Sequence, residues 1–334
     1  MRSAPPTSND TKPLASISLD LDNQWSYMEI HGDSGWEKFP SYFEIFIPKV
    51  LDILDRFNLK ITFFVVGQDA ALDKNGEMLS LLTARGHEVG NHSFSHEPWF
   101  HLYPKEHIRQ EILKTEEHIV RVTGQKPIGF RGPGYSWSSE LFEVLIENGY
   151  VYDASTLPTY IGPIARMYYF RTSNFTREEK DRRNRLFGSF RDGLRPVKPF
   201  CWNLDSGADA KLLEIPITTI PILKTPFHLS YLLYLSRFSL NLMSLYLTTA
   251  LNLCRLTGTT PSYLLHPLDF LGGDQIPELA FFPGMDLSGK QKMEIFERVL
   301  KELEKHFTFG NMSLYAKSIL PGGNTNSYGA HQSS

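Results

Sequence analysis

Residues 14–22 read LASISLDLD, a short apolar run that ends in two aspartates. It is followed by FEIFIPKVLDILDRF at 43–57, whose apolar residues recur at helical spacing, and by KITFFVVG at 60–67, a second apolar run. Short apolar runs of this kind predict buried strands, and the longer periodic segment between them predicts a helix. A strand, a helix and a strand in this order indicate a βαβ unit with parallel strands.

The alternation continues along most of the chain. Further strand-like runs lie at 87–93, 127–134, 150–155, 212–217 and 261–270, and the helical segments between them often end at a glycine. Glycine commonly follows the last turn of a helix because it adopts the left-handed conformation without strain. We therefore predict an α/β fold built on a parallel sheet or barrel.

The regular pattern has two gaps. It predicts one domain over 14–320 with insertions at about 156–211 and 225–258. The flanking segments 1–13 and 321–334 are polar and rich in Pro, Gly or Ser, a composition typical of disordered tails.

Composition excludes several classes of protein. Hydrophobic residues make up 41% of the chain and aromatic residues 13%, enough for a sizeable core. The formal net charge of -3 argues against a nucleic-acid partner, which usually requires a basic field. Two cysteines, Cys201 and Cys254, are too few for a disulfide framework, and the segment MRSAPPTSNDTKP lacks the apolar core of a signal peptide. We expect a cytoplasmic protein, on the inner membrane face if it contacts a membrane.

Two aspartates follow the first predicted strand. Asp20 and Asp22 lie two residues apart, so that both carboxylates should project to one side near the carboxyl end of the strand. Functional sites of α/β folds form at that edge. Taken alone, the two aspartates are equally consistent with a functional site and with side chains that cap the following turn.

Two histidines follow a later strand. His92 and His96 are four residues apart in GHEVGNHSFSHEPW, a spacing that places two imidazoles on one face of a helical turn. Alone, such a pair is more often a hydrogen-bonded structural pair than a metal site. His87 lacks a partner at this spacing, and we interpret it as structural.

The two pairs strengthen each other because both follow strands of one predicted sheet. Two histidines and one aspartate make a three-ligand metal site with open positions, and the second aspartate could act as a base. Two more residues end strands. Arg131 in FRGPGYSW could pair with a buried carboxylate, although taken alone it is more simply interpreted as part of a surface ion pair. His266 ends the run SYLLH, and taken alone it is more simply interpreted as a core histidine.

Together these residues resemble the polysaccharide deacetylase family, the NodB-homology enzymes of carbohydrate esterase family 4. The resemblance covers most of 14–155 and resumes over about 212–310. His92-Ser93-x-x-His96 after HEVGN looks like the histidine metal motif of the family. SLDLDN resembles the first motif, usually T-F-D-D-G, in a D-x-D form.

The resemblance implies a role for each of these motifs. Asp20 would be the general base, and Asp22, His92 and His96 would bind the metal, while the D-x-D spacing leaves open which aspartate does which.

The remaining motifs complete the implied site. Arg131-Gly132-Pro133-Gly134 looks like the R-P-P-Y motif, which implies that Arg131 orients Asp20 and that the Gly134 N–H holds the oxyanion. His266 would be the general acid, and Asp153 in YVYDAS stands where the family has residues that support that histidine.

The resemblance also implies a fold and a reaction. The fold would be a distorted (β/α) barrel. The reaction would be hydrolysis of an N-acetyl or other N-acyl group of an amino sugar by a metal-activated water, with one divalent ion. We expect Zn²⁺, with Co²⁺, Ni²⁺, Mn²⁺ or Fe²⁺ as alternatives.

The insertions suggest further contacts. FTREEKDRRNRLFGSFRDGLRPVK, 175–198, has eight basic and four acidic residues and is either a solvated face or a phosphate-binding lid for a nucleotide-linked or lipid-linked sugar. The segment 226–256 includes 17 uncharged residues between Arg237 and Arg255, too few for an ordinary membrane span. It forms either helices packed on the barrel or a peripheral membrane contact.

Three other functions stay open. The fold could hydrolyse a non-sugar amide or cyclic imide. A non-haem Fe(II) oxygenase also uses two histidines and one carboxylate, but it needs neither Asp20, Arg131 nor His266. A non-catalytic carbohydrate-binding relic would not need the base and the acid. The sequence identifies neither the sugar nor the oligomeric state.

Overall fold

The computed structural model describes residues 12–161, 190–202 and 211–320. Most of the two predicted disordered tails lies outside the described residues, and so does most of the basic segment 175–198.

A sheet of nine strands organises the chain. Its order is β6-β7-β5-β4-β3-β2-β1-β8, and β9 pairs with the beginning of β1. All neighbours are parallel except β6 and β7. The strands are β1 (Leu14–Leu21), β2 (Thr62–Val65), β3 (Glu88–Asn91), β4 (Gly129–Phe130), β5 (Tyr152–Asp153), β6 (Phe200–Trp202), β7 (Leu212–Glu214), β8 (Ser262–Leu265) and β9 (Thr308–Gly310).

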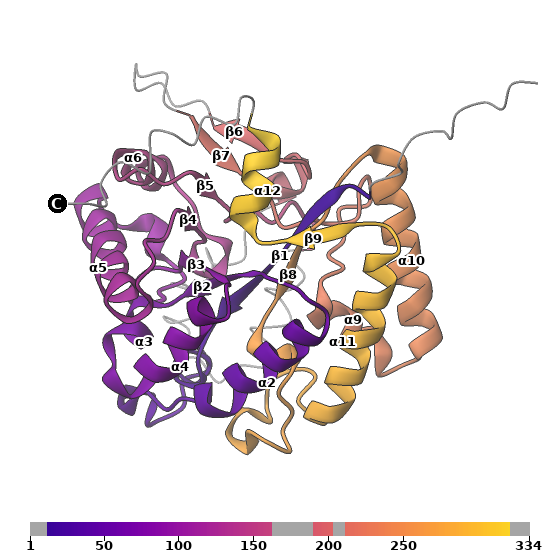
Figure 1. Cartoon of the computed structure of the whole chain (residues 1–334), viewed down its shortest axis with the longest axis horizontal. Helices are drawn as coiled ribbons and strands as arrows, with labels where there is room; N and C mark the ends of the chain where they lie inside the picture. Colours follow the sequence, from indigo (N-terminus) through magenta and orange to yellow (C-terminus); the bar gives the residue numbers. More distant parts are fainter. Residues whose placement is uncertain (1–11, 162–189, 203–210, 321–334) are drawn as a thin grey trace, which may run out of the picture.

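Helices form an outer layer around this sheet (Figure 1). α9, α10 and α11 lie on one side of the view, and α3 to α6 lie on the other. The α-helices are α1 (Gln24–His31), α2 (Phe43–Arg56), α3 (Gly67–Ala71), α4 (Asp73–Ala84), α5 (Lys105–Thr123), α6 (Ser139–Glu147), α9 (Leu229–Ser236), α10 (Leu240–Thr257), α11 (Gly289–Glu304) and α12 (Met312–Ile319). Short 3₁₀ turns are η1 (Trp36–Lys38), η2 (Phe100–Leu102), η3 (Pro133–Tyr135), η4 (Phe190–Leu194), η5 (Pro267–Asp269) and η6 (Pro277–Leu279).

The predicted α/β fold is confirmed, as a curled sheet that forms part of a barrel. Among the described strands, no pairing joins β6 to β8 across the opening. β1 lies between β2 and the edge strand β8, and seven of its eight residues are buried because helices cover the sheet. On α2, the residues Phe43, Phe46, Ile47, Val50 and Leu54 recur at helical spacing and pack into the main core.

The two insertions take different forms. The described part of the first adds η4 and β6, which lengthens the sheet beyond β7. The second contains α9 and α10, whose inner residues Leu232, Met243, Leu247 and Leu251 join the main core. Within the described ranges, we find no helix with the length and apolarity required to cross a membrane.

Candidate active site

The carboxyl ends of β1, β3, β4 and β8 meet at one edge of the sheet, and their parallel pairing places the predicted site residues together. Asp20 lies in β1 and Asp22 directly follows it, His92 follows β3, Arg131 follows β4, and His266 follows β8. The sequence pattern predicted this convergence correctly.

Asp22, His92 and His96 form a buried cluster. Their donor atoms lie within 4.8 Å of one another. Asp22 Oδ1 is 3.1 Å from His96 Nε2 and 3.4 Å from His92 Nε2, without a directed hydrogen bond to either. His92 Nδ1 lies 2.6 Å from the Arg131 carbonyl oxygen and donates to it, so its Nε2 lone pair faces Asp22.

The electrostatics of this cluster favour a positive charge. Burial would raise the pKa of the Asp22 carboxyl, but the His96 and His92 imidazoles outweigh burial and lower that pKa. Burial would lower the pKa of His92, but the Asp20 and Asp22 carboxylates outweigh it and raise that pKa. Two ring nitrogens and one carboxylate oxygen that face one another can be satisfied together by one cation, so these residues fit a divalent metal with open positions.

The backbone between the two histidines differs from the predicted helical turn. Residues 92–98 form an irregular loop, and Ser93 and His96 have left-handed backbone angles, with φ of 60° and 54°. The buried Glu111 carboxylate on α5 accepts hydrogen bonds from the N–H groups of Phe94 and Ser95. This carboxylate holds the loop in place, and the left-handed angles of Ser93 and His96 exclude a regular helical turn between the two histidines.

Arg131 connects Asp20 to the cluster of Asp22, His92 and His96. Its Nη1 atom donates to Asp20 Oδ1 at 2.6 Å and to Ser18 Oγ at 2.9 Å, and its Nε atom donates to the Ala154 carbonyl at 2.9 Å. The guanidinium also lies 4.3 Å from the centre of the Phe64 ring. Because Arg131 is fully buried, its ion pair holds the Asp20 carboxylate in one orientation.

His266 faces the other oxygen of the same carboxylate. Its Nε2 atom lies 4.0 Å from Asp20 Oδ2. On the other side of the ring, His266 Nδ1 lies 3.9 Å from Asp269 Oδ2, and Asp269 Oδ1 accepts a hydrogen bond from Ser230 Oγ at 2.7 Å. The predicted base Asp20 and the predicted acid His266 therefore lie side by side, and Asp269 lies on the opposite side of the His266 ring.

We predicted by resemblance that Asp153 supports His266, but the contacts of Asp153 are with other residues. Asp153 accepts hydrogen bonds from the Ser155 hydroxyl and N–H, and it shares a buried site with Glu214. Ser155 Oγ in turn accepts the Gly132 N–H at 2.8 Å. Asp153 therefore supports the Arg131 segment, whereas Asp269 lies beside His266, because Pro267 begins a short turn that folds Asp269 back.

Gly134 lies at the mouth of the cluster. It is exposed and has a φ of 61°, and a Cβ atom at this position would lie 3.5 Å from Pro98, two residues beyond His96. The backbone of Gly134 thus approaches the loop of the metal ligands. His87 lies away from the cluster, and its Nδ1 atom accepts the Ile61 N–H, consistent with a structural role.

Three residues of the site were missed from the sequence. Glu111 lies within an otherwise ordinary amphipathic helix, and Ser230 lies in an insertion. Asp269 was visible in the run HPLD, three residues after His266, a spacing that allows a side chain to reach back.

Comparisons with known proteins show which family the chain resembles. Residues 32–152 match the family model described as polysaccharide deacetylase. A peptidoglycan deacetylase of Helicobacter pylori is 29% identical over 168 residues, which cover 48% of this chain and 55% of that protein. A peptidoglycan-N-acetylglucosamine deacetylase of Bacillus cereus is 38% identical over 88 residues, which cover 26% and 31%. The chain therefore spans about half the length of the first relative and a third of the second.

One solved structure shares the overall fold. A Mycobacterium smegmatis protein, provisionally described as a polysaccharide deacetylase, superposes with a TM-score of 0.57 at 20% identity. The superposition covers 96% of this chain and 94% of that protein. This likeness confirms the predicted barrel-type fold.

Proposed function

We propose that this member of the polysaccharide deacetylase family removes the N-acetyl group of an amino sugar, with one divalent cation held by Asp22, His92 and His96. One observation carries the proposal. The Arg131-paired carboxylate of Asp20 lies between this cluster and His266, so a base and an acid both adjoin the place where a cation would sit.

The residues have distinct tasks in this reaction. A bound cation would polarise the acyl carbonyl and lower the pKa of water towards about 7. Asp20 accepts the proton of the attacking water, because Arg131 orients its carboxylate through a hydrogen bond. His266 gives a proton to the departing amine, and Asp269 holds its ring in place. The backbone N–H of Gly134 donates to the oxygen that becomes negative, an interaction that is usually a large part of catalysis.

The donor set supports zinc as the cation. Two imidazole nitrogens and one carboxylate oxygen are ligands that Zn²⁺ uses in catalytic sites. Co²⁺, Ni²⁺, Mn²⁺ and Fe²⁺ accept similar ligands and stay alternatives.

The substrate class is proposed from the names of relatives. The names of the two curated relatives support an N-acetylated amino sugar of a glycan. The basic composition of segment 175–198 suggests a more specific substrate, a sugar linked to a phosphate or a lipid. A non-sugar amide or cyclic imide would use the same residues.

An acetate-release assay tests the proposal. The purified chain, loaded with Zn²⁺, is offered glycan fragments, free N-acetyl sugars, nucleotide-linked and lipid-linked N-acetyl sugars, and cyclic imides. We expect acetate release from at least one N-acetyl sugar, and its loss in Asp20→Asn and His266→Ala while Zn²⁺ stays bound. Oxygen-dependent turnover with Fe²⁺, or zinc binding without turnover of any compound, would contradict it.

We also propose a cytoplasmic location, which rests on the low cysteine content of the chain. Cell fractionation with a tagged full-length chain would test it.

A further inference from the structure

The outward face of α10 is unusual for a helix at a protein surface. Its inward residues, including Met243, Leu247 and Leu251, are buried in the core. Surface helices normally place charged side chains on the opposite face. Apart from Arg255 near its carboxyl end, the exposed positions of α10 carry no charge. Five of them follow one another three or four residues apart, namely Leu242, Leu245, Thr249, Asn252 and Leu256, which we call the outer stripe.

The apolar members of this stripe are strongly exposed. Leu245 is 66% exposed and Leu256 is 81% exposed. Phe238, just before the helix, is 68% exposed. A helix with apolar residues on both faces is normally covered on both, so the outer stripe indicates a surface that a partner covers.

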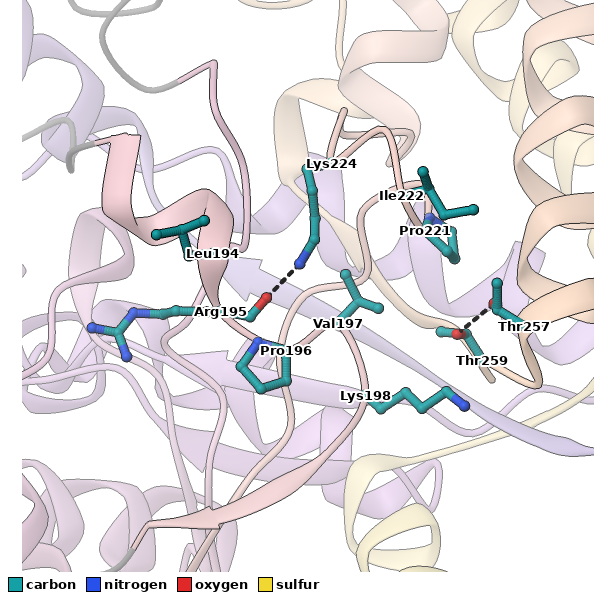
Figure 2. A pocket seen from close by; sticks show the side chains of 10 residues that line it. All are labelled: Leu194, Arg195, Pro196, Val197, Lys198, Pro221, Ile222, Lys224, Thr257 and Thr259. Atoms are coloured by element: carbon teal, nitrogen blue, oxygen red, sulfur yellow. Dashed lines mark hydrogen bonds between the residues drawn. The ribbon is translucent and has the colours of Figure 1, made fainter.

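A shallow depression lies at the carboxyl end of α10 (Figure 2). We call it the basic depression. Its volume is about 440 Å³, and its lining includes Arg195, Lys198 and Lys224 but no acidic residue. Leu194 and Ile222, each 75% exposed, also belong to its lining. The most exposed apolar side chains of this region thus accompany three positive charges.

Two of these cations have no carboxylate partner in the part of the chain that the structure describes. Within the described ranges, no carboxylate pairs with Lys198 or Lys224. Lys224 Nζ is partly buried and donates to the Arg195 carbonyl oxygen, and burial lowers its pKa. Arg195 differs, because it lies 3.4 Å from Asp192 and stacks on the Trp137 ring. A partly buried ammonium group that no described carboxylate neutralises favours an anionic partner.

The charge pattern of the sequence extends this observation. From Ile215 to Leu268 the chain contains no Asp or Glu, whereas it contains Lys224, Arg237 and Arg255. Arg237 pairs with Asp286 on another segment. The region that includes α9 and α10 therefore carries only positive charge of its own, which complements an anionic surface.

The size of the outer stripe argues against a second copy of the chain as its partner. A helix of 18 residues extends about 27 Å, so a strip about 10 Å wide buries roughly 300 Å². Stable interfaces bury about 800 Å² on each partner. An anionic bilayer needs no such minimum, because exposed apolar side chains enter the headgroup boundary while basic residues contact lipid phosphates.

We propose that the outer stripe and the basic depression form a docking surface for an anionic phospholipid membrane. Lipid phosphates bind to Lys198 and Lys224, and Leu194, Ile222, Leu245 and Leu256 enter the headgroup boundary. The inference does not rest on the proposed function, because membrane binding is measured without turnover.

Sedimentation with vesicles tests this surface. The full chain is mixed with vesicles of phosphatidylcholine alone or with added phosphatidylglycerol. The test variant is Leu245→Ser/Lys198→Glu. The matched control is Leu314→Ser/Lys317→Glu on α12, where Leu314 is 50% exposed and both residues lie on the surface. Thermal unfolding followed by circular dichroism checks that both variants are folded.

We expect sedimentation with the anionic vesicles only, weakened by salt, and reduced about tenfold in the test variant but unchanged in the control. Four results would overturn the proposal. The chain could fail to sediment with anionic vesicles, or the test variant and the control variant could lose binding equally. Light scattering could instead show a dimer that Leu245→Ser alone dissociates, which would make the stripe an interface between copies. Complete competition by inorganic phosphate at constant ionic strength would indicate a site for free phosphate.

Discussion

Arg131→Met is expected to destabilise the protein strongly. The Arg131 side chain is 0% exposed, and its Nη1 atom lies 2.6 Å from Asp20 Oδ1. Methionine has a similar length but no charge, so Asp20 would remain buried without its counter-charge. Removal of one partner from a buried ion pair costs about 3–5 kcal/mol. That is a large share of the roughly 5–15 kcal/mol by which ordinary domains are stable.

A double variant separates the charge from the packing. In Arg131→Met/Asp20→Asn the carboxylate becomes a neutral amide, and we expect the loss to fall to about 1–2 kcal/mol. Urea unfolding followed by circular dichroism gives the free energy of unfolding of each variant. Arg56→Met/Glu297→Gln is the matched control on an exposed pair, where the coupling should stay below about 1 kcal/mol.

The same variants separate stability from catalysis. The double variant should be folded yet inactive in acetate release, because it lacks the base. If the two single substitutions add to the double value within about 0.5 kcal/mol, Arg131 and Asp20 are not coupled and the reasoning is refuted.

Three further predictions concern other parts of the site. Asp269→Asn should lower kcat roughly tenfold or more with KM little changed, because the ring of His266 loses its positioning partner; equal changes in both constants would contradict this. Burial and the Asp153 carboxylate raise the pKa of Glu214 above its usual 4.5, so its protonated form stabilises the fold at low pH, and the free energy of unfolding should fall as pH rises above about 4.5. Glu214→Gln should flatten this fall in urea unfolding, and an unchanged slope would exclude Glu214 as its source. A chelator should lower the Tm of the native chain, Zn²⁺ should restore it, and His96→Ala should respond to neither.

The main features of the site could be predicted because parallel strands end at one edge. Asp20, Asp22, Arg131 and His266 each stand at the end of an apolar run, and strand pairing alone brings such positions together. This argument needs no knowledge of side-chain contacts. It therefore works for residues on or next to strands.

Contacts that depend on loops could not be predicted in this way. The spacing of His92 and His96 suits both a helical turn and the observed loop, and the choice depends on Glu111, which is close in space but distant in sequence. The partner of His266 was assigned to Asp153 by resemblance, whereas a local turn brings Asp269 to that ring. Ser230 could not be foreseen because the pattern of an insertion does not show where its ends touch the site.

The hydrogen bond from Ser230 to Asp269 limits how this chain can be engineered. The segment 225–258 looks like a detachable module in the sequence, and its removal would be the obvious way to obtain a smaller catalyst. Such trimming would also remove the hydroxyl that fixes the carboxylate behind His266. Grafting of this region between relatives should therefore transfer β8 and the HPLD turn together with α9 and α10.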